Sequence, residues 1–209
     1  MGRHRREERT DSFRLLFVCT GNICRSPFAE ILARHLLRGR LGGRASQGFD
    51  ISSAGIAAVV GAPMHPDSRT ELAPWHLDGA PSAGFVARQL DSTMIEASDL
   101  VLGATARHRS AVIEQCPPAL PITFAVREFA RLAAAVDPRE LPAHPVARAH
   151  ALVDLARLRR GLVPPDPEGD DVPDPIGGPA AAHHRAAQLI QVAVTGLVDV
   201  VAPPVHRAG

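Results

Sequence analysis

The stretch that decides the fold is Phe13-Arg14-Leu15-Leu16-Phe17-Val18-Cys19-Thr20-Gly21-Asn22-Ile23-Cys24-Arg25-Ser26-Pro27-Phe28-Ala29-Glu30. Its first six residues form a short apolar run with aromatic and branched side chains, which is typical of a buried strand. Ser26-Pro27, with Glu30 close behind, is typical of a first helical turn, and apolar residues at 28, 32, 36 and 37 follow helical spacing. The stretch therefore predicts a strand, a tight loop and a helix.

Outward from this unit, strands and helices alternate along the chain. Short apolar runs predict further strands at 51–55, 98–102 and 120–124. Between and after them, apolar spacing predicts helices at 28–40, 83–97, 105–115 and 180–201. Alternation of this kind predicts an α/β fold, with a parallel sheet covered by helices on both faces.

The domain organisation follows from length and composition. A chain of 209 residues, at roughly 150 residues per domain, is better read as one domain with an addition than as two. Residues 1–12 are polar and mixed in charge, which predicts a mobile N-terminal arm before a single domain over 13–209. Residues 125–165 are rich in alanine and arginine, and we expect a helical insertion there, with helices at 126–136 and 146–160.

Charge and hydropathy exclude several classes of protein. There are 23 basic and 22 acidic residues, a net charge of +1, so no global field attracts nucleic acid or an anionic membrane. No apolar run approaches the roughly 18 residues that span a bilayer, and residues 15–18 are too short for a signal-peptide core. We therefore expect a cytoplasmic protein that binds neither nucleic acid nor membrane. The residues leave its oligomeric state open.

Cysteine and histidine patterns argue against a structural disulfide or metal framework. Three cysteines cannot make a disulfide scaffold, and none of them forms a C-x2-C pair. Adjacent helical positions such as His183-His184 point apart, so we expect no metal site and no cofactor. Cys116, before two prolines, is interpreted as a packing residue at a helix end.

The loop that begins at Cys19 carries the chemistry. A loop between a strand end and a helix start can direct successive N–H groups at an anion, with the positive end of the helix dipole beneath it. The same field, together with Arg25, favours the ionised form of a cysteine, so Cys19 is the candidate nucleophile. Arg25 can also grip two phosphate oxygens with its planar fork. Gly21 and Asn22 tolerate left-handed backbone, and Ser26 can donate a hydrogen bond to the sulfur. The residues that we expect to bind phosphate are Thr20, Gly21, Asn22, Ile23, Cys24, Arg25 and Ser26. The alternative is a structural turn around a buried thiol.

The stretch from Phe17 to Glu30 resembles the phosphate loop of the low-molecular-weight protein tyrosine phosphatases. The resemblance covers about 13–124 and then 170 to the end of the sequence. The further stretches that support it are 53–55, 61–63, 87–90, 98–102 and Pro173-Asp174-Pro175. It implies a four-stranded parallel sheet in a three-layer sandwich. It also implies a metal-free enzyme that cleaves phosphate monoesters through a cysteinyl-phosphate intermediate.

The resemblance places the general acid at Asp174, in the late Asp-Pro pair. Cleavage of a phosphate ester needs a proton for the leaving oxygen, and Asp174 lies in a proline- and glycine-rich segment that we expect to fold over the pocket. Like-charge repulsion from neighbouring acidic residues is expected to favour its protonated form. Those residues are Asp166, Glu168, Asp170 and Asp171. The alternative is an ordinary turn aspartate before a proline.

The sequence departs from the family at the walls of the pocket. The family flanks phosphotyrosine with aromatic residues at two places, which are occupied here by Val59, on an approximate alignment, and by Ile176. Loss of ring stacking, worth about 0.5 to 1.5 kcal/mol per pair, predicts weaker phosphotyrosine binding and opens the site to other phosphorylated proteins or small phosphate esters. Trp75 is either a replacement wall or, as we expect, a packing residue. The run 157–160 is either a site for acidic substrates or, as we expect, a solvated helix end that faces residues 166–171.

Two further alternatives concern Cys24 and the type of activity. In relatives that have this second loop cysteine, it closes a reversible disulfide that shields the nucleophile; here the other interpretation is a small buried filler. An arsenate reductase coupled to thioredoxin would need two cysteines just beyond the third strand, and residues 103–109 contain none. A reductase that uses a small thiol, and a non-catalytic phosphate-binding module, remain as alternatives to a phosphatase.

Overall fold

The computed structural model describes residues 11–166 and 168–204. Its centre is a sheet of four parallel strands, β1 (Phe13–Cys19), β2 (Phe49–Gly55), β3 (Leu100–Gly103) and β4 (Thr123–Ala125), in the order β2-β1-β3-β4. Cys19 is in register with Gly55, and Val18 with Gly103. Because the strands are parallel, their carboxyl ends meet at one edge, where ligands bind in open α/β sheets. The expected N-terminal arm over residues 1–12 lies outside the described residues, except for its last two.

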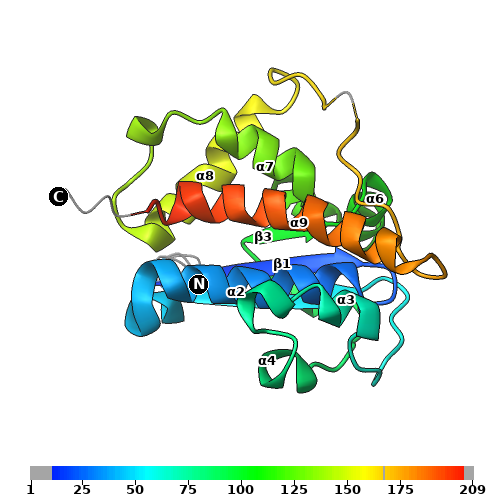
Figure 1. Cartoon of the computed structure of the whole chain (residues 1–209). Helices are drawn as coiled ribbons and strands as arrows, with labels where there is room; N and C mark the ends of the chain where they lie inside the picture. Colours follow the sequence, from blue (N-terminus) through cyan, green and yellow to red (C-terminus); the bar gives the residue numbers. More distant parts are fainter. Residues whose placement is uncertain (1–10, 167, 205–209) are drawn as a thin grey trace.

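Helices cover both faces of the sheet, as the sequence predicts. One face packs against α2 (Arg25–Ala45), α7 (Val126–Ala134), α8 (Pro145–Arg159) and α9 (Ala180–Val201). In Figure 1, α9 runs alongside α2 in front of β1 and β3. The other face carries α5 (Ser92–Ala97) and α6 (Ala106–Gln115). These layers make the three-layer α/β sandwich.

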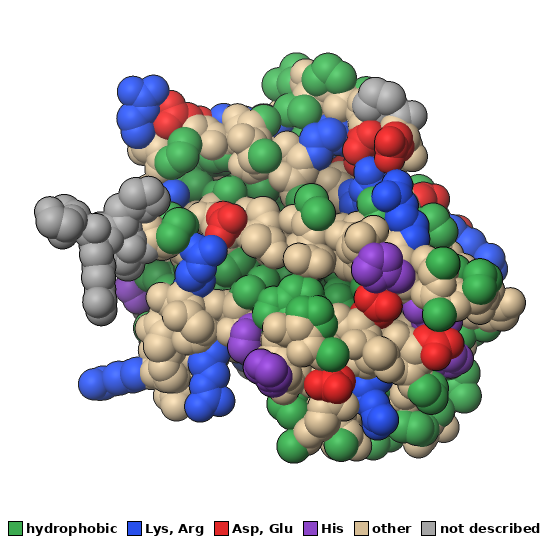
Figure 2. Space-filling view, viewed as in Figure 1, with side chains coloured by type: hydrophobic (Ala, Val, Ile, Leu, Met, Phe, Trp, Pro, Cys, Tyr) green, Lys and Arg blue, Asp and Glu red, His purple; other side chains and the backbone are tan. Residues whose placement is uncertain are grey.

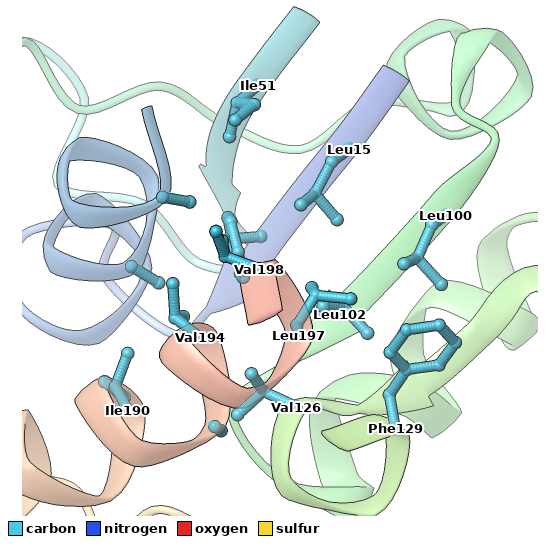
Figure 3. Packing of buried hydrophobic residues seen from close by; sticks show 14 of the residues in the cluster. Leu15, Ile51, Leu100, Leu102, Val126, Phe129, Ile190, Val194, Leu197 and Val198 are labelled. Carbon is cyan, nitrogen blue, oxygen red and sulfur yellow. The ribbon is translucent and has the colours of Figure 1, made fainter. Parts of the chain in front are cut away.

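Alternation along the strands divides the buried residues into two cores. Leu15 of β1 and Leu100 and Leu102 of β3 point toward α9, where they meet Val194, Leu197 and Val198 (Figure 3). The intervening residues Leu16, Val18 and Val101 point to the opposite face, where Ile95 of α5 and Val112 of α6 cover them. Strands with apolar residues on both faces are typical of parallel sheets between helical layers.

The expected helical insertion consists of α7, a short 3-10 helix (Pro138–Glu140) and α8. Phe129 and Leu132 of α7 and Leu152 of α8 are buried in the same core as the sheet. The insertion thus shares one hydrophobic core with the sheet and α9.

One expected helix is wrong in part. Residues 83–97 form the end of α4 (Ala80–Ala83) and α5, and the segment between them is extended. Gln89 pairs with Gly55 as an isolated parallel bridge, and Leu90 N–H donates to the Gly55 carbonyl. This non-local pairing outweighs the local helical spacing.

Other boundaries differ by a few residues. The expected strand 120–124 is β4 over 123–125, because Pro117, Pro118 and Pro121 lack the N–H of a regular ladder and form a 3-10 helix (Pro117–Ile122). The remaining short elements are α3 (Pro66–Thr70) and two 3-10 helices (Ser46–Gly48 and Ala73–Trp75).

The surface carries mixed charge. On the face in Figure 2, basic and acidic side chains are interspersed over the helices. Among the described residues, no helix is long and apolar enough to cross a membrane.

Candidate active site

The loop from Thr20 to Cys24 joins the end of β1 to the start of α2. Asn22 takes the left-handed conformation, with φ of 54°, as the sequence led us to expect. Cys24 is the N-cap of the 21-residue helix, and its side chain makes no cap hydrogen bond. The positive end of a long helix is therefore directed at this loop.

Hydrogen bonds turn the carbonyl groups of the loop away from its centre. The carbonyls of Cys19, Thr20 and Gly21 accept from the N–H groups of residues 56, 57 and 59, at 2.9 to 3.0 Å. The carbonyl of Ile23 accepts from the N–H of His65 at 2.8 Å. Because each trans peptide directs its N–H opposite to its carbonyl, the N–H groups that follow these carbonyls point inward. This is the geometry of an anion cradle.

The side chain of Asn22 fixes the shape of the loop. It is fully buried, and its Oδ1 accepts from the backbone N–H of Arg88 at 2.9 Å. That contact makes the other amide atom the donor, and Nδ2 donates to Ser53 Oγ and to Ser26 Oγ, each at 2.9 Å. The loop is thus tied to the end of β2 and to the extended segment before α5.

Cys19 ends β1 and is 2% exposed, at the base of the loop. Its Sγ lies 2.9 Å from Ser26 Oγ. Since that hydroxyl already accepts from Asn22, its own hydrogen is left for Sγ or for the more distant Ala54 carbonyl at 3.5 Å. The shorter contact indicates that Ser26 donates to the sulfur.

Arg25 is 4% exposed, and its guanidinium spans the rim of the loop. Nη1 donates to the Val172 carbonyl at 3.1 Å, and Nη2 forms an ion pair with Asp174 Oδ2 at 2.7 Å. Nη2 also lies 3.4 Å from Thr20 Oγ1. Nε is buried and has no partner among the described residues, so one donor of this group is available to a bound anion.

The structure brings Asp174 to the rim through a fixed anchor on the sheet. Val172 is fully buried, and its N–H donates to the Ala104 carbonyl at 2.8 Å, beyond the end of β3. Two residues later, Asp174 pairs with Arg25 while its side chain stays 46% exposed. The acid candidate thus lies beside the loop and remains open to solvent.

The interpretation of the neighbouring acidic residues is corrected. Asp166 pairs with Arg127 and Asp170 with Arg131, both from α7, at 2.8 and 2.7 Å. Asp171 accepts from the Ala106 N–H at the start of α6. Glu168 lies 3.4 Å from Arg185, so each of the four acidic neighbours has a partner of its own, as Asp174 has Arg25.

The expected contact between residues 157–160 and the acidic segment is also wrong. Arg159 pairs with Glu140, and Arg160 pairs with Glu128 while stacking on the Phe124 ring at 3.9 Å. Arg157 lies 4.0 Å from Asp154 on its own helix. The end of α8 therefore meets β4 and α7, and Arg127 and Arg131 of α7 bind the acidic segment instead.

A neutral histidine supports the first residue of the loop. His108 Nε2 lies 3.0 Å from Thr20 Oγ1, and its Nδ1 lies 2.7 Å from Thr105 Oγ1. Burial, followed by the positive charge of Arg25, lowers the pKa of His108 from 6.5 to about 4. The ring is therefore uncharged at neutral pH and holds Thr20 by hydrogen bonding alone.

The expected wall residues lie at the surface. Val59 and Ile176 are 51% and 50% exposed. A Cβ built on Gly21 would lie 3.6 Å from Val59 Cγ2, so Val59 borders the loop. Trp75 instead packs edge-on against Phe28 at 6.3 Å and joins the larger core, which places it in the packing role.

The other cysteines and the paired histidines are placed as follows. Cys24 and Cys116 are buried free thiols, and burial raises the pKa of Cys24 to about 11. His183 is buried, whereas His184 is exposed and pairs with Glu71, so the two rings do point apart. His183 nevertheless meets His65 and Cys24, residues far from it in the sequence.

The residues that support the loop from behind were not predicted from the sequence. Ser53 and Arg88 lie in stretches that support the family resemblance, but nothing in their spacing assigns them to Asn22. Thr105 is the N-cap of α6, with its side chain accepting from the His108 N–H, and a helix-start pattern can find such a cap. Its second contact, to the His108 ring, needs the folded structure.

Comparison with known families and proteins identifies similar chains that are phosphatases. The family described as "Low molecular weight phosphotyrosine protein phosphatase" matches residues 14–135. The low-molecular-weight protein-tyrosine-phosphatase of Streptomyces coelicolor is 30% identical over 191 residues, which are 91% of this chain and 94% of that protein. The protein-arginine-phosphatase of Geobacillus stearothermophilus is 31% identical over 117 residues, 56% of this chain and 71% of that protein.

A solved structure shows the same architecture. The YwlE arginine phosphatase from Geobacillus stearothermophilus superimposes with a TM-score of 0.61 and 26% identity, covering 90% of this chain and 91% of that one. The family match spans more than half of the chain, and the Streptomyces relative aligns along nearly all of it. This chain therefore belongs to the low-molecular-weight phosphotyrosine protein phosphatase family.

Proposed function

We propose that this phosphatase hydrolyses phosphotyrosine in proteins, with Cys19 as the nucleophile, Arg25 as the phosphate clamp and Asp174 as the general acid. The observation that carries the proposal is the position of the Cys19 sulfur at the base of a loop whose carbonyl groups are turned outward. The N–H groups of residues 20–25 then surround the three outer oxygens of a phosphate placed above the sulfur. We assign Thr20, Gly21, Asn22, Ile23, Cys24 and Ser26 to this phosphate-binding loop, together with Arg25.

In the first step, the Cys19 thiolate attacks phosphorus in line with the leaving oxygen. A sulfur–phosphorus bond forms, the bond to the leaving oxygen breaks, and Asp174 gives that oxygen a proton. Ser26 donates a hydrogen bond to the sulfur, and the loop N–H groups with Arg25 stabilise the charge on the outer oxygens.

In the second step, water attacks the phosphocysteine. The ionised Asp174 takes the water proton, an oxygen–phosphorus bond forms, and the sulfur leaves as a thiolate. The products are inorganic phosphate and the starting enzyme, with Asp174 protonated again. No cofactor is needed to balance either step.

The ion pair between Arg25 and Asp174 belongs to the resting enzyme. A phosphate dianion competes with Asp174 for the same Nη2 and finds the unpartnered Nε beside it. Bidentate binding through these two donors would release the carboxylate toward the leaving oxygen. Substrate binding would thus free Asp174 from Arg25 and make it available as the proton donor.

The similarity to the Streptomyces protein-tyrosine-phosphatase, which matches this chain over almost its full length, supports phosphotyrosine as the substrate. A second candidate substrate is phosphoarginine in proteins, because the Geobacillus relative is named for that activity. Both groups carry the phosphate on a planar end group, a phenol ring or a guanidinium, and the aliphatic residues Val59 and Ile176 would flank either one.

The decisive assay compares two phosphopeptides of one sequence, one with phosphotyrosine and one with phosphoarginine. We expect the wild-type enzyme to have the higher kcat/KM for phosphotyrosine, and Cys19→Ser to abolish turnover of both. Preference for phosphoarginine would reassign the substrate, and appreciable turnover by Cys19→Ser would refute the covalent route. Arsenate with a small thiol donor is the third arm, and its reduction without phosphatase activity would favour the reductase.

We further propose that residues 13–209 act as one phosphatase domain, with 125–165 as its helical insertion, in the cytoplasm. One buried core joins the sheet to α7, α8 and α9, which supports a single folding unit. Three free thiols suit a reducing compartment.

A further inference from the structure

Behind the phosphate loop, three potential metal ligands come together from distant parts of the chain. Cys24 caps α2, His65 precedes α3, and His183 lies in the first turn of α9. One ligand atom from each lies within 4.8 Å of the other two. Cys24 and His183 are 3% and 2% exposed. Folding therefore brings a thiol and two imidazoles together, with Cys24 and His183 buried and His65 half-buried.

The polar atoms of this group are only partly satisfied by the protein. Ser68 Oγ lies 2.8 Å from His183 Nδ1, which fixes the orientation of that ring. The His65 ring stacks on the His183 ring at 4.6 Å, with an angle of 19° between the planes. His65 Nδ1 is buried and has no hydrogen-bond partner among the described residues. A buried ring nitrogen without a partner destabilises the folded chain, and a metal ion would satisfy it.

We propose that Cys24, His65 and His183 bind a zinc ion. One thiolate and two imidazoles are a donor set that zinc accepts readily. Zinc–sulfur and zinc–nitrogen bonds of about 2.3 and 2.0 to 2.1 Å require ligand atoms about 3.3 to 3.6 Å apart, so the three side chains close in slightly. Binding replaces the hydrogen of the Cys24 thiol, which leaves as a proton, and no redox step is involved.

The fourth zinc position has a protein carboxylate nearby. Asp67 Oδ2 lies 3.9 Å from His183 Nε2, and this carboxylate is 50% exposed. It is available as the fourth ligand or as a partner for a water in that position. With zinc on Nε2, His183 would donate its Nδ1–H to Ser68 Oγ, and such an outer contact orients a metal-bound histidine.

The site would link the phosphate loop to two helices. A zinc ion on the Cys24 sulfur would join the start of α2 to the loop before α3 and to α9. It would also occupy the thiol that lies five positions from Cys19, so the Cys19–Cys24 pair could no longer form a disulfide. Zinc binding would thereby stabilise the loop and set its response to oxidants.

Cobalt(II) is the spectroscopic probe for this site. We expect the reduced, chelator-treated full chain to bind one equivalent, with a thiolate-to-cobalt charge-transfer band that zinc abolishes by displacement. Cys24→Ser should abolish the band. His65→Ala and His183→Gln should each weaken binding about tenfold or more. Zinc should also raise the Tm of the wild-type protein and not that of Cys24→Ser.

The chain offers matched controls for each ligand type. His184→Ala removes the exposed neighbour of His183, and Cys116→Ser removes a buried thiol on the other face of the sheet. Both variants, and Cys19→Ser, should keep the band. If Cys19→Ser loses the band and Cys24→Ser keeps it, the metal lies on the proposed nucleophile and the site is refuted. A wild-type protein that binds no stoichiometric cobalt would also refute it. If Cys24→Ser does not fold by circular dichroism, the half-buried His65→Ala decides.

Discussion

At the scale of single residues, backbone contact matters as much as side-chain chemistry. Gly55 ends β2 directly opposite Cys19, and its N–H and carbonyl are both used by the extended segment 88–90. A Cβ at this position would lie 2.5 Å from the Thr20 carbonyl and 3.0 Å from the Asn22 nitrogen. The residue is glycine because the loop that follows Cys19 occupies the space of a side chain.

Gly55→Ala should therefore damage the loop itself. We expect a loss of about 1 to 3 kcal/mol in the free energy of unfolding, as for other overpacked sites, and a clear rise in the inhibition constant of inorganic phosphate. Gly39→Ala is the control, because this exposed helical glycine has open space around it and should gain up to about 1 kcal/mol. Urea unfolding and phosphate inhibition measure both variants, and equal behaviour of the two would contradict the argument.

Asp174→Asn tests the acid at the same scale. Asparagine keeps the size of the side chain but cannot supply the proton, so kcat for an aryl phosphate with a poor leaving group should fall by about 10² to 10⁴. Arg25 loses its ion-pair partner, so phosphate should bind at least as well as before. A full rate in Asp174→Asn would remove it from this role.

The chemical role of a residue was easier to predict from the sequence than its contacts with distant residues. Cys19, Asn22, Arg25 and Ser26 could be predicted as one group from a single stretch, since residues close in this part of the sequence are also close in space. The arginines that bind the acidic segment lie about 39 residues before it, on α7, and no spacing connects them. The Cys24, His65 and His183 group spans even longer separations, and only the tertiary fold brings its members together.

At the scale of elements, apolar spacing alone predicted the bounds of a helix that packs on the core along its whole length. The expected helix 180–201 has the bounds of α9, whose apolar face lies along the sheet. The expected helix 83–97 failed because pairing with Gly55 and Ala62 fixes residues 87–90 in an extended form. Non-local hydrogen bonds decide such a segment, and amphipathic periodicity carries no information about them.

The segment between α8 and α9 depends on α7 for its position. Arg131 binds Asp170 and also donates to the carbonyls of Val163 and Pro164, at 3.2 and 2.7 Å. Arg131→Gln should loosen the segment that carries Asp174, and we expect kcat to fall severalfold with little change in phosphate affinity. Arg139→Gln is the matched control, because its ion pair with Asp137 is local and exposed. An unchanged kcat in Arg131→Gln would show that the remaining contacts, from Arg127 and at Val172, are enough to fix the segment.

At the scale of the whole molecule, stability should depend on pH through His108. Its pKa of about 4 in the folded chain lies below the unfolded value of 6.5, so the unfolded chain binds more protons between these two values. The free energy of unfolding therefore falls as the pH falls through this interval, by up to about 3 kcal/mol in total. Glu30 contributes the opposite slope, because burial raises its pKa, and stability is lost as the pH rises above the ordinary value of this carboxyl.

Comparison with His108→Gln isolates the histidine, since the contribution of Glu30 is common to both proteins and cancels. Glutamine can bond Thr20 or Thr105 but does not titrate, so the variant should be less stable than wild type at pH 7 and should lose less stability on acidification. Urea unfolding at pH 7, 5.5 and 4.5 gives the difference at each pH, which should shrink steadily toward acid. A constant difference would mean that His108 has the same protonation in the folded and unfolded chains, and its neutral hydrogen bond to Thr20 would then no longer explain how the first residue of the loop is held.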